Sequence, residues 1–326
     1  MKKKYSEDKV CAIVVTFNRK MLLKECLKGV MAQTHGISCI LIVDNASTDD
    51  TEQLLLNEGY IRETPSKEGK EPFVTDFKKN NSLGQSVDIL YVRMPINTGG
   101  AGGFYEGQKR AYDLGYTWLW LMDDDGYPED VCVEKLLDKS DETSLLVLNP
   151  IVINVAEKSQ LSFGLSKSIQ TVDDAKRNKD EYGLIRNLAN PFNGTFLHRN
   201  IIERNGLIKK EMFIWGDESE YFKRIASSGE GFATVVDANF FHPVTKTVYK
   251  TKFGFLRIPT KPEKLEMNFY RNQGYLNRKY GSVLSHRVLF KVILFYFLEG
   301  DFKKVNKVFK YYLDGFYNRY NLPCMD

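Results

Sequence analysis

Three consecutive aspartates, Asp123, Asp124 and Asp125, end a short apolar stretch near the middle of the chain. That stretch, residues 117–122, is too short for a typical helix and predicts a buried strand. Adjacent carboxylates repel one another, so we expect them at the carboxyl edge of a sheet beside a cation. Alternation along a strand should place Asp123 and Asp125 on one side and Asp124 on the other. The spacing indicates a divalent ion that also holds a diphosphate, and the alternative is an acidic turn in solvent.

A second acidic element follows Trp215, where Asp217 and Glu218 stand at the start of a helical apolar pattern. Carboxylates at this position often only cap a helix and complement its dipole. An aromatic side chain beside paired carboxylates can instead form a platform for a sugar and raise the pKa of a general base. Asp217 and Glu218 are therefore candidate bases and Trp215 a candidate platform, with helix capping as the alternative.

His242 closes a predicted strand over residues 232–241. A histidine at the end of a strand is usually only a polar surface residue. As a third protein ligand beside two aspartates, however, it would complete a metal site.

Glycines fill the segment 97–103, which begins with Asn97 and holds four glycines in five residues. It follows a predicted strand over residues 87–92 and precedes a predicted helix over residues 104–114. Backbone amides in such a loop can approach an anionic ligand closely, whereas the alternative is a simple flexible turn. The position just before the triple aspartate favours binding and makes Asn97 and Gly100 candidate ligands of that anion.

The elements that would position these groups alternate between strands and helices. A β-branched run over residues 10–17 predicts a strand, and the apolar spacing of residues 22–31 predicts a helix. A second strand, residues 39–43, runs into Asp44, whereas residues 59–86 are charged and predict a surface excursion. Acids and amides at the ends of successive strands indicate an α/β fold with a parallel sheet and a ligand crevice at the carboxyl ends of the strands.

The chain of 326 residues, 43% of them hydrophobic, is long enough to bury a full core. Residues 1–9 lack the apolar segment of a signal peptide, and the apolar run 288–298 is too short to span a bilayer, so a cytoplasmic location is expected. The cysteines are odd in number and scattered, which predicts reduced core residues and neither disulfides nor a zinc site. They are Cys11, Cys26, Cys39, Cys132 and Cys324.

Charge is divided unevenly along the chain. Residues 250–326 hold 15 Lys and Arg against 6 Asp and Glu, a net charge of +9, which leaves −5 for residues 1–249. The same C-terminal part has a helical, aromatic pattern with basic residues between the aromatic ones. It predicts a helical subdomain that packs on the core, and also a surface for anionic lipid headgroups. No nucleic-acid partner is expected, because no nucleic-acid motif accompanies the charge.

With these residues in view, the chain resembles the inverting glycosyltransferases of family 2, which have the GT-A fold, over residues 10–243. Residues 14–19 are similar to the family's opening nucleotide-binding strand, and residues 43–47 are similar to its second strand. Residues 97–104 together with 120–125 resemble the narrower galactofuranosyltransferase and rhamnosyltransferase branch.

The resemblance implies a role for each candidate residue. In that branch the outer acids of the triple and a later histidine hold Mn²⁺ or Mg²⁺, which assigns a metal site to Asp123, Asp125 and His242. The base is a carboxylate in an element matched here by residues 215–220, where both Asp217 and Glu218 stay open and the pattern favours Glu218. Asp44 would hold the nucleobase. The residues expected to meet the nucleotide-sugar are Thr16, Asn18, Arg19, Asp44, Asn97, Gly100, Asp123 and Asp124.

Together these assignments predict a metal-dependent inverting glycosyltransferase with a GT-A domain over residues 1–250 and a basic, aromatic, helical region over residues 251–326. A UDP- or dTDP-linked donor, with galactofuranose or rhamnose favoured, would give its sugar to a polysaccharide or a lipid-linked glycan. The basic region would meet an anionic membrane surface on its cytoplasmic face, where such acceptors lie.

Two rival functions have their own sequence requirements. A sugar nucleotidyltransferase should show a glycine-rich loop with a lysine directly after the first strand, whereas this chain has Thr-Phe-Asn-Arg there. A non-catalytic nucleotide-sugar-binding protein would not need the acids and His242, which are intact in this chain.

Overall fold

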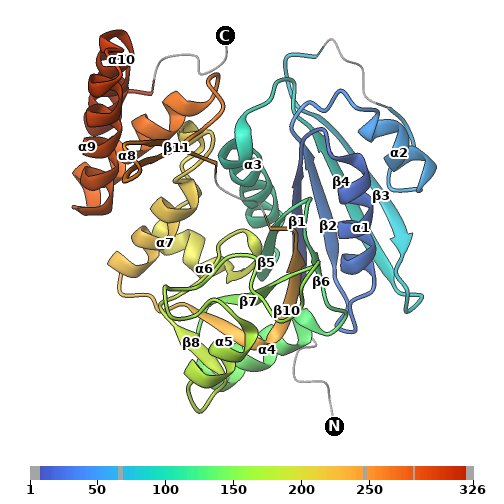
Figure 1. The fold of residues 1–326 in the computed structure, drawn as a ribbon. Coiled ribbons are helices and arrows are strands. Elements are labelled where there is room, and N and C mark those ends of the chain that lie inside the picture. Colours follow the sequence, from blue (N-terminus) through green and yellow to red (C-terminus); the bar gives the residue numbers. More distant parts are fainter. Residues whose placement is uncertain (1–7, 65–68, 245–247, 282, 321–326) are drawn as a thin grey trace. The chain divides into compact units, whose positions relative to one another are not determined.

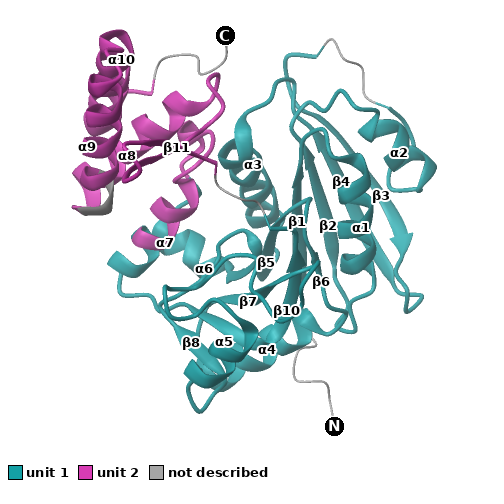
Figure 2. Cartoon of the chain, viewed as in Figure 1, with its two compact units in different colours: residues 1–208, 224–244 teal, residues 209–223, 245–326 magenta. Residues whose placement is uncertain are grey.

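Two compact units make up the computed structural model, which describes residues 8–64, 69–244, 248–281 and 283–320 (Figure 2). The first unit holds residues 1–208 with 224–244, and the second holds residues 209–223 with 245–326. The acidic element at Asp217 therefore belongs with the C-terminal helices in this division. A catalytic domain over residues 1–250 with an appendage from residue 251 stays a prediction.

A mixed β-sheet forms the centre of the first unit (Figure 1). Its strand order is β3-β4-β2-β1-β5-β9-β7-β10-β6, with β8 paired to β10. Strands β4, β2, β1 and β5 run parallel, whereas β9 lies antiparallel between β5 and β7. The strands are β1 (Val10–Thr16), β2 (Cys39–Asp44), β3 (Phe73–Asn80), β4 (Ser86–Arg93), β5 (Trp118–Asp123), β6 (Tyr127–Pro128), β7 (Val147–Asn154), β8 (Leu184–Arg186), β9 (Asn193–His198) and β10 (Ala233–His242).

Helices pack on both faces of this sheet, because side chains alternate along its strands. Ala12 and Val14 of β1 share a core with residues of α1 and α4. On the other face α3 comes so close that a Cβ added to Gly107 would lie 2.4 Å from Ile13 Cγ2. The helices of this unit are α1 (Lys20–Met31), α2 (Thr51–Asn57), α3 (Gly99–Asp113), α4 (Cys132–Thr143), α5 (Val172–Asn178) and α6 (Arg199–Asn205). The predicted α/β fold with a mostly parallel sheet is confirmed.

Two segments differ from their prediction. The sequence predicts a glycine loop ahead of a helix at Phe104, but α3 already begins at Gly99. The physical reason is packing, because a Cβ on Gly103 would lie 2.5 Å from Val15 Cγ1 and would force the helix away from β1. The expected surface excursion, residues 59–86, contains β3, an edge strand whose alternating half-buried and exposed residues lack the apolar character of a core strand.

The cysteines that the structure describes lie in the core, as the sequence predicts. Cys11, Cys26, Cys39 and Cys132 are buried free thiols, and Cys324 lies outside the described residues. In the part of the chain that the structure describes, no helix has both the length and the apolar character needed to cross a bilayer.

The second unit combines a β-hairpin with helices. Leu256 and Ile258 of the hairpin pack into one core with Val292 and Phe295 of α9. The C-terminal helices are confirmed, whereas the hairpin is an addition to the predicted helical region. The elements are the short 3₁₀ helix Lys210–Met212, α7 (Asp217–Ser227), whose last residues belong to the first unit, β11 (Tyr249–Lys252), β12 (Leu256–Pro259), α8 (Glu266–Tyr280), α9 (Val283–Leu298) and α10 (Phe302–Phe316).

Helices α8 and α10 touch at two glycines. A Cβ built on Gly315 would lie 1.6 Å from the carbonyl oxygen of Arg271, and one built on Gly274 would lie 2.0 Å from that of Tyr312. We expect Gly315→Ala to lower the free energy of unfolding by about 3 kcal/mol, because the added methyl group overpacks this contact. Thermal unfolding followed by circular dichroism measures the loss.

The matched control for this prediction is Gly69→Ala, whose added Cβ would meet only an ordinary contact at 3.4 Å. It should melt like the wild type. A melting temperature of Gly315→Ala equal to that of the wild type would contradict the close approach of α8 and α10.

Candidate active site

The triple aspartate lies beside the turn that follows β1, because β1 and β5 are parallel neighbours and their carboxyl ends meet at one edge of the sheet. Thr16 donates a hydrogen bond from Oγ1 to Asp124 Oδ2 at 2.6 Å. Arg19 donates from Nη1 to Asp124 Oδ1 at 3.2 Å and to Asp125 Oδ2 at 2.6 Å. The structure thus brings four of the predicted site residues into direct contact.

One arginine nitrogen bridges Asp124 and Asp125, which differs from the expected separation of these side chains by alternation. The reason is that β5 ends at Asp123, so the next two acids belong to a turn and do not follow the geometry of a strand. Asp124 is buried, whereas Asp125 is half-buried.

Burial and charge give the two acids different ionisation. Burial raises the pKa of Asp124 to about 6, although the hydrogen bond from Thr16 and the charge of Arg19 act in the opposite direction. Burial acts on Asp125 as well, but there the hydrogen bond and charge of His242, together with Arg19, outweigh it and hold the pKa below its usual value. Asp125 is therefore the more firmly ionised of the two.

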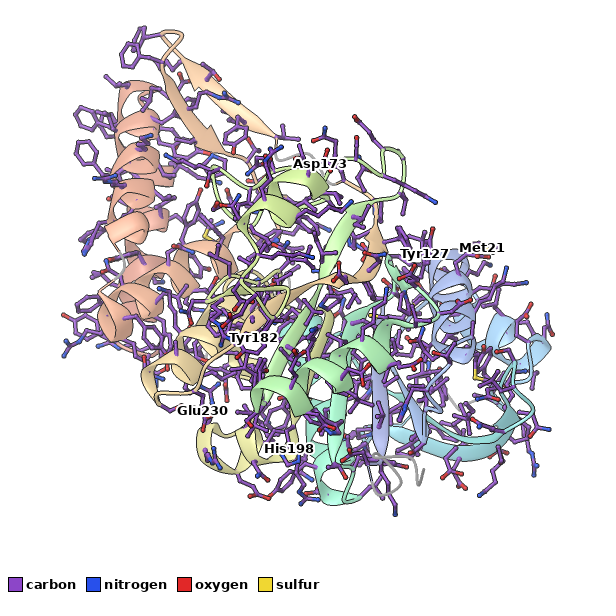
Figure 3. All side chains as sticks on the ribbon, turned by 90° about the horizontal axis from the view of Figure 1, so that it is seen from below. Met21, Tyr127, Asp173, Tyr182, His198 and Glu230 are labelled. Atoms are coloured by element: carbon purple, nitrogen blue, oxygen red, sulfur yellow. The ribbon has the colours of Figure 1, made fainter. Side chains whose placement is uncertain are left out.

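His242 reaches the acids from the end of β10. Its Nε2 lies 2.9 Å from Asp125 Oδ1, and its Nδ1 lies 2.6 Å from the carbonyl oxygen of Pro243. Because a carbonyl oxygen and an ionised carboxylate only accept, Nδ1 carries a proton and the contact with Asp125 needs a second proton on Nε2. The bond from Nδ1 fixes the orientation of the ring, and a metal ion at Nε2 would replace the proton there. His198 of β9 pairs with Trp118 at the start of β5, away from the acids. Figure 3 shows His198 well apart from Tyr127, which follows the acids in the chain.

Asp123, Asp125 and His242 have the types of ligand atom that a divalent cation binds. A contact between them is seen for Asp125 and His242, which offer one oxygen and one nitrogen ligand. Asp123, the third expected ligand, is half-exposed at the end of β5. Among the described residues, no group of three or more His, Cys, Asp and Glu side chains is arranged to hold a metal ion. The metal roles of these three residues stay predictions.

Asp44, at the end of β2, is fully buried and uses both carboxylate oxygens within the protein. Oδ1 accepts from the Ser47 N–H at 2.8 Å, and Oδ2 accepts from the Tyr91 hydroxyl at 2.9 Å. Burial raises the pKa of Asp44, although these hydrogen bonds act in the opposite direction. The contacts support an anchor for the loop after β2, and contact with a nucleobase stays a prediction.

Two asparagines shape the loops around the acids. Asn18 has a left-handed backbone, with φ of 55°, and its Oδ1 accepts from the Thr48 N–H at 2.6 Å. Asn97 Oδ1 accepts from the Gly99 N–H at 2.8 Å, at the start of α3. A Cβ added to Gly100 would meet nothing within 4 Å, so the first turn of α3 has open space beside its backbone. Free N–H groups of a helix start can bind an anion there.

Asn45 is a buried site residue that its sequence context does not single out. Its Oδ1 accepts from Thr98 Oγ1, and its Nδ2 donates to the carbonyl oxygen of Gly99, both at 2.8 Å. It therefore joins the loop after β2 to the start of α3. A polar residue behind a predicted strand is the signal that the sequence offers, but nothing there identifies the partner.

The acidic element of the second unit follows a strained turn. The backbone φ is 64° at Phe213 and 61° at Trp215, in a region unfavourable for aromatic residues. Asn272 of α8 stabilises this turn, because its Nδ2 donates to the carbonyl oxygens of residues 212, 214 and 215 at 2.8, 3.0 and 3.0 Å. Strain of this kind persists only where the surroundings enforce it, and it is frequent at functional sites.

The three acids after this turn differ in accessibility. Glu220 is buried, and its Oε1 accepts from Lys279 Nζ at 3.0 Å. Asp217 is also buried at the start of α7. Glu218 is half-exposed, and its Oε2 accepts from the Gly216 N–H at 3.1 Å. Among the three, Glu218 therefore has the carboxylate most accessible to a ligand.

Lys261 is a further residue at this element. Its Nζ lies 4.3 Å from the centroid of the Trp215 ring, so an ammonium group shares the face proposed for a sugar. Burial lowers the pKa of Lys261, and the charge of Glu218 acts in the opposite direction. Lys261 and Asn272 both reach the turn from distant parts of the chain, which is why no local pattern identifies them.

Comparisons with known proteins identify the family of the chain. The model of the family described as glycosyl transferase family 2 matches residues 11–179. The chain is 31% identical over 278 residues to galactofuranosyltransferase GlfT1 of Mycolicibacterium smegmatis. It is 30% identical over 275 residues to galactofuranosyltransferase GlfT1 of Mycobacterium tuberculosis, and each match covers 82% of both chains.

Solved structures show the same fold. The crystal structure of S. aureus TarS aligns with a TM-score of 0.52 and 13% identity over 88% of this chain and 42% of that one. The structure of TarS 1–349 aligns with a TM-score of 0.50 and 12% identity over 94% of this chain and 92% of that one. At such identities the likeness concerns the fold alone. The family match spans more than half of the sequence, and the relatives above align with most of the chain. The protein therefore belongs to glycosyl transferase family 2 and is a glycosyltransferase.

Proposed function

We propose that this glycosyltransferase moves galactofuranose from a UDP-linked donor to a glycan acceptor and inverts the anomeric configuration. The contacts of Arg19, Asp125 and His242 at the strand ends carry the proposal, because they place a permanent cation and two candidate metal ligands at one site. Galactofuranose is favoured over rhamnose from a dTDP-linked donor, because the relatives at 30% and 31% identity are named galactofuranosyltransferases.

The carboxyl edge of the sheet would bind the diphosphate of the donor. Arg19 stays charged and its side chain is 49% exposed, so it can turn from the acids to phosphate oxygens. The open first turn of α3 at Gly100 can donate backbone N–H groups to the same anion. A divalent ion, Mn²⁺ or Mg²⁺, held by Asp123, Asp125 and His242 would act as a Lewis acid toward the departing diphosphate.

The acceptor hydroxyl needs a base, and we assign this role to Glu218. In a single displacement the acceptor oxygen bonds to the anomeric carbon, the bond from that carbon to the diphosphate breaks, and the hydroxyl proton passes to Glu218. Asp217 is buried beside it and would position this carboxylate, and Trp215 would stack on a sugar ring. No covalent intermediate with the protein is required.

The acceptor is proposed to be a polysaccharide or a lipid-linked glycan, met at the cytoplasmic face of a membrane. The support is the net charge of +9 over residues 250–326, since basic residues are attracted to anionic lipid. Such a surface would bring the enzyme close to acceptors carried on lipids.

A donor screen tests the proposed function. The purified protein is incubated with UDP-galactofuranose, dTDP-rhamnose and common UDP-hexopyranoses, each with Mn²⁺ or with EDTA, and release of the nucleotide is measured in the presence of glycan acceptors. We expect acceptor-dependent turnover with UDP-galactofuranose that EDTA abolishes. Turnover confined to hexopyranose donors would contradict the assigned sugar, and turnover unaffected by EDTA would contradict the metal site.

A further inference from the structure

The β11–β12 hairpin ends in two exposed aromatic side chains. Phe253 is 65% exposed and Phe255 is 79% exposed, and their ring centroids lie 6.3 Å apart. The strands behind this tip are fixed, because Leu256 and Ile258 of β12 belong to the core of the unit. The hairpin therefore presents a pair of phenylalanines to the surroundings on a supported structure.

The turn itself is unfavourable for phenylalanine. Phe253 has φ of 52° and Gly254 has φ of 73°, within the three-residue loop between the paired residues Lys252 and Leu256. Asparagine adopts positive φ much more readily than phenylalanine does. A bulky residue with positive φ is strained, and asparagine in its place would relieve that strain. Phe253 thus lowers local stability, which indicates that the ring serves a purpose other than folding.

The hairpin tip is connected to the adjoining ends of α9 and α10. Lys252, beside Phe253, hydrogen-bonds Glu299 directly after α9. Phe297 of α9 is 56% exposed and contacts Phe302 of α10, which is 57% exposed, with ring centroids 5.6 Å apart. Exposed rings from three elements therefore share one end of the second unit, which we call the aromatic end: Phe253, Phe255, Phe297 and Phe302.

Basic side chains border the aromatic end along α10. Lys303, Lys307 and Lys310 are exposed and, at spacings of four and three residues, form one stripe on the helix. Phe302 and Phe309, seven residues apart and both exposed, form an adjacent stripe. A helix with an aromatic stripe beside a lysine stripe suits the boundary between lipid headgroups and acyl chains.

The hairpin repeats this combination of rings and positive charge. Arg257 is exposed, with its guanidinium carbon 4.4 Å from the centroid of the Tyr249 ring, and Lys250 is exposed on the neighbouring strand. Among the nearby acids, Glu299 pairs with Lys252, whereas Asp301 accepts from the Lys304 N–H at the start of α10 at 2.9 Å and keeps its negative charge. The exposed lysines of α10, together with Lys250 and Arg257, outnumber these acids, so the border of the aromatic end is net positive.

We propose that the aromatic end inserts its phenylalanine rings into an anionic lipid surface while the flanking lysines and arginine contact the headgroups. This inference rests on the proposed function in one respect, since it identifies the surface at which a lipid-linked acceptor would be met. A second copy of this chain is a poorer partner, because its lysines would face the same lysines and because lysine is depleted from the core of protein interfaces. An anionic bilayer is complementary in both charge and polarity.

Vesicle sedimentation tests the insertion. We expect the wild type to bind vesicles that contain phosphatidylglycerol, to bind pure phosphatidylcholine vesicles much less, and to lose affinity as salt is added. Phe253→Asn with Phe255→Ser should weaken binding by about tenfold for each ring removed. The first substitution favours the turn, so a loss of binding with an unchanged melting temperature is not a loss of folding.

Two further variants sharpen the test. Replacing Lys303, Lys307 and Lys310 together by Gln should weaken binding to anionic vesicles and remove most of its salt dependence, because each basic residue contributes about fivefold. Leu83→Ser is the control, since Leu83 is 52% exposed in the first unit and should not affect binding.

Unchanged vesicle binding in the double phenylalanine variant would overturn the proposal, as would equal binding to neutral and anionic vesicles. Self-association that the same variant abolishes, without vesicle binding by the wild type, would instead assign the surface to a contact between copies. Turnover with a water-soluble acceptor is measured in parallel and should be unaffected in the phenylalanine variant. Vesicle binding needs no donor, so absent turnover in the wild type counts against the proposed function and not against insertion.

Discussion

Glu218→Gln is expected to lower turnover by about a hundredfold or more while donor binding is retained, because an amide cannot take the proton of the acceptor hydroxyl. The amide oxygen of glutamine can still accept the hydrogen bond from the Gly216 N–H, so the turn should keep its shape. Initial rates at saturating donor and acceptor measure turnover, and calorimetric titration with UDP measures binding.

Asp217→Asn is the matched variant. Asp217 is buried at the start of α7, so we expect a milder loss that reflects positioning of the neighbouring carboxylate. Turnover that survives in Glu218→Gln but disappears in Asp217→Asn would reverse the two roles. If both variants stay active, the element after Trp215 only caps a helix and the base lies elsewhere.

Asp125→Ala and His242→Ala should each weaken the binding of UDP in the presence of Mn²⁺ by about a hundredfold. Loss of a residue that only supports a metal ligand already lowers metal affinity by about 10- to 100-fold, so loss of a direct ligand should reach the upper part of that range. The two residues contact each other at 2.9 Å, and both variants should therefore show the same loss. Calorimetry with Mn²⁺ and with EDTA gives the affinities.

Asp124→Asn is the control for this pair. Its side chain is buried and bonded to Thr16 and Arg19, so it should affect the cation less than the loss of Asp125 does. UDP binding that is unchanged by EDTA and by both alanine substitutions would contradict the proposed metal site.

The donor half of the site follows closely from local sequence pattern. β1, β2 and β5 are apolar runs, and their polar residues begin where the strands end. β1 and β5 are parallel neighbours, so the residues that follow them lie at the same edge of the sheet. Thr16 and Arg19 contact Asp124 for this reason alone. The expected alternation of the acids is wrong because β5 ends at Asp123, and a strand pattern says little about the turn beyond it.

Residues that work through distant partners could not be predicted in the same way. Asn45, Lys261 and Asn272 are ordinary polar residues in the sequence, and each gains its role from a backbone or ring that the fold brings to it. The β11–β12 hairpin is also difficult to predict from the sequence. Its strands have four residues each and include charged side chains, so they are too short to show the alternation of apolar and polar residues that identifies a strand.

The anomeric configuration of the product tests most directly the central claim, a single displacement with Glu218 as base. Nuclear magnetic resonance of the purified product, formed from UDP-galactofuranose, gives the configuration of the new glycosidic bond relative to that of the donor. A single displacement assisted by Glu218 predicts the opposite configuration in every product molecule. Retention of the donor configuration would contradict direct displacement and the role of Glu218 as base.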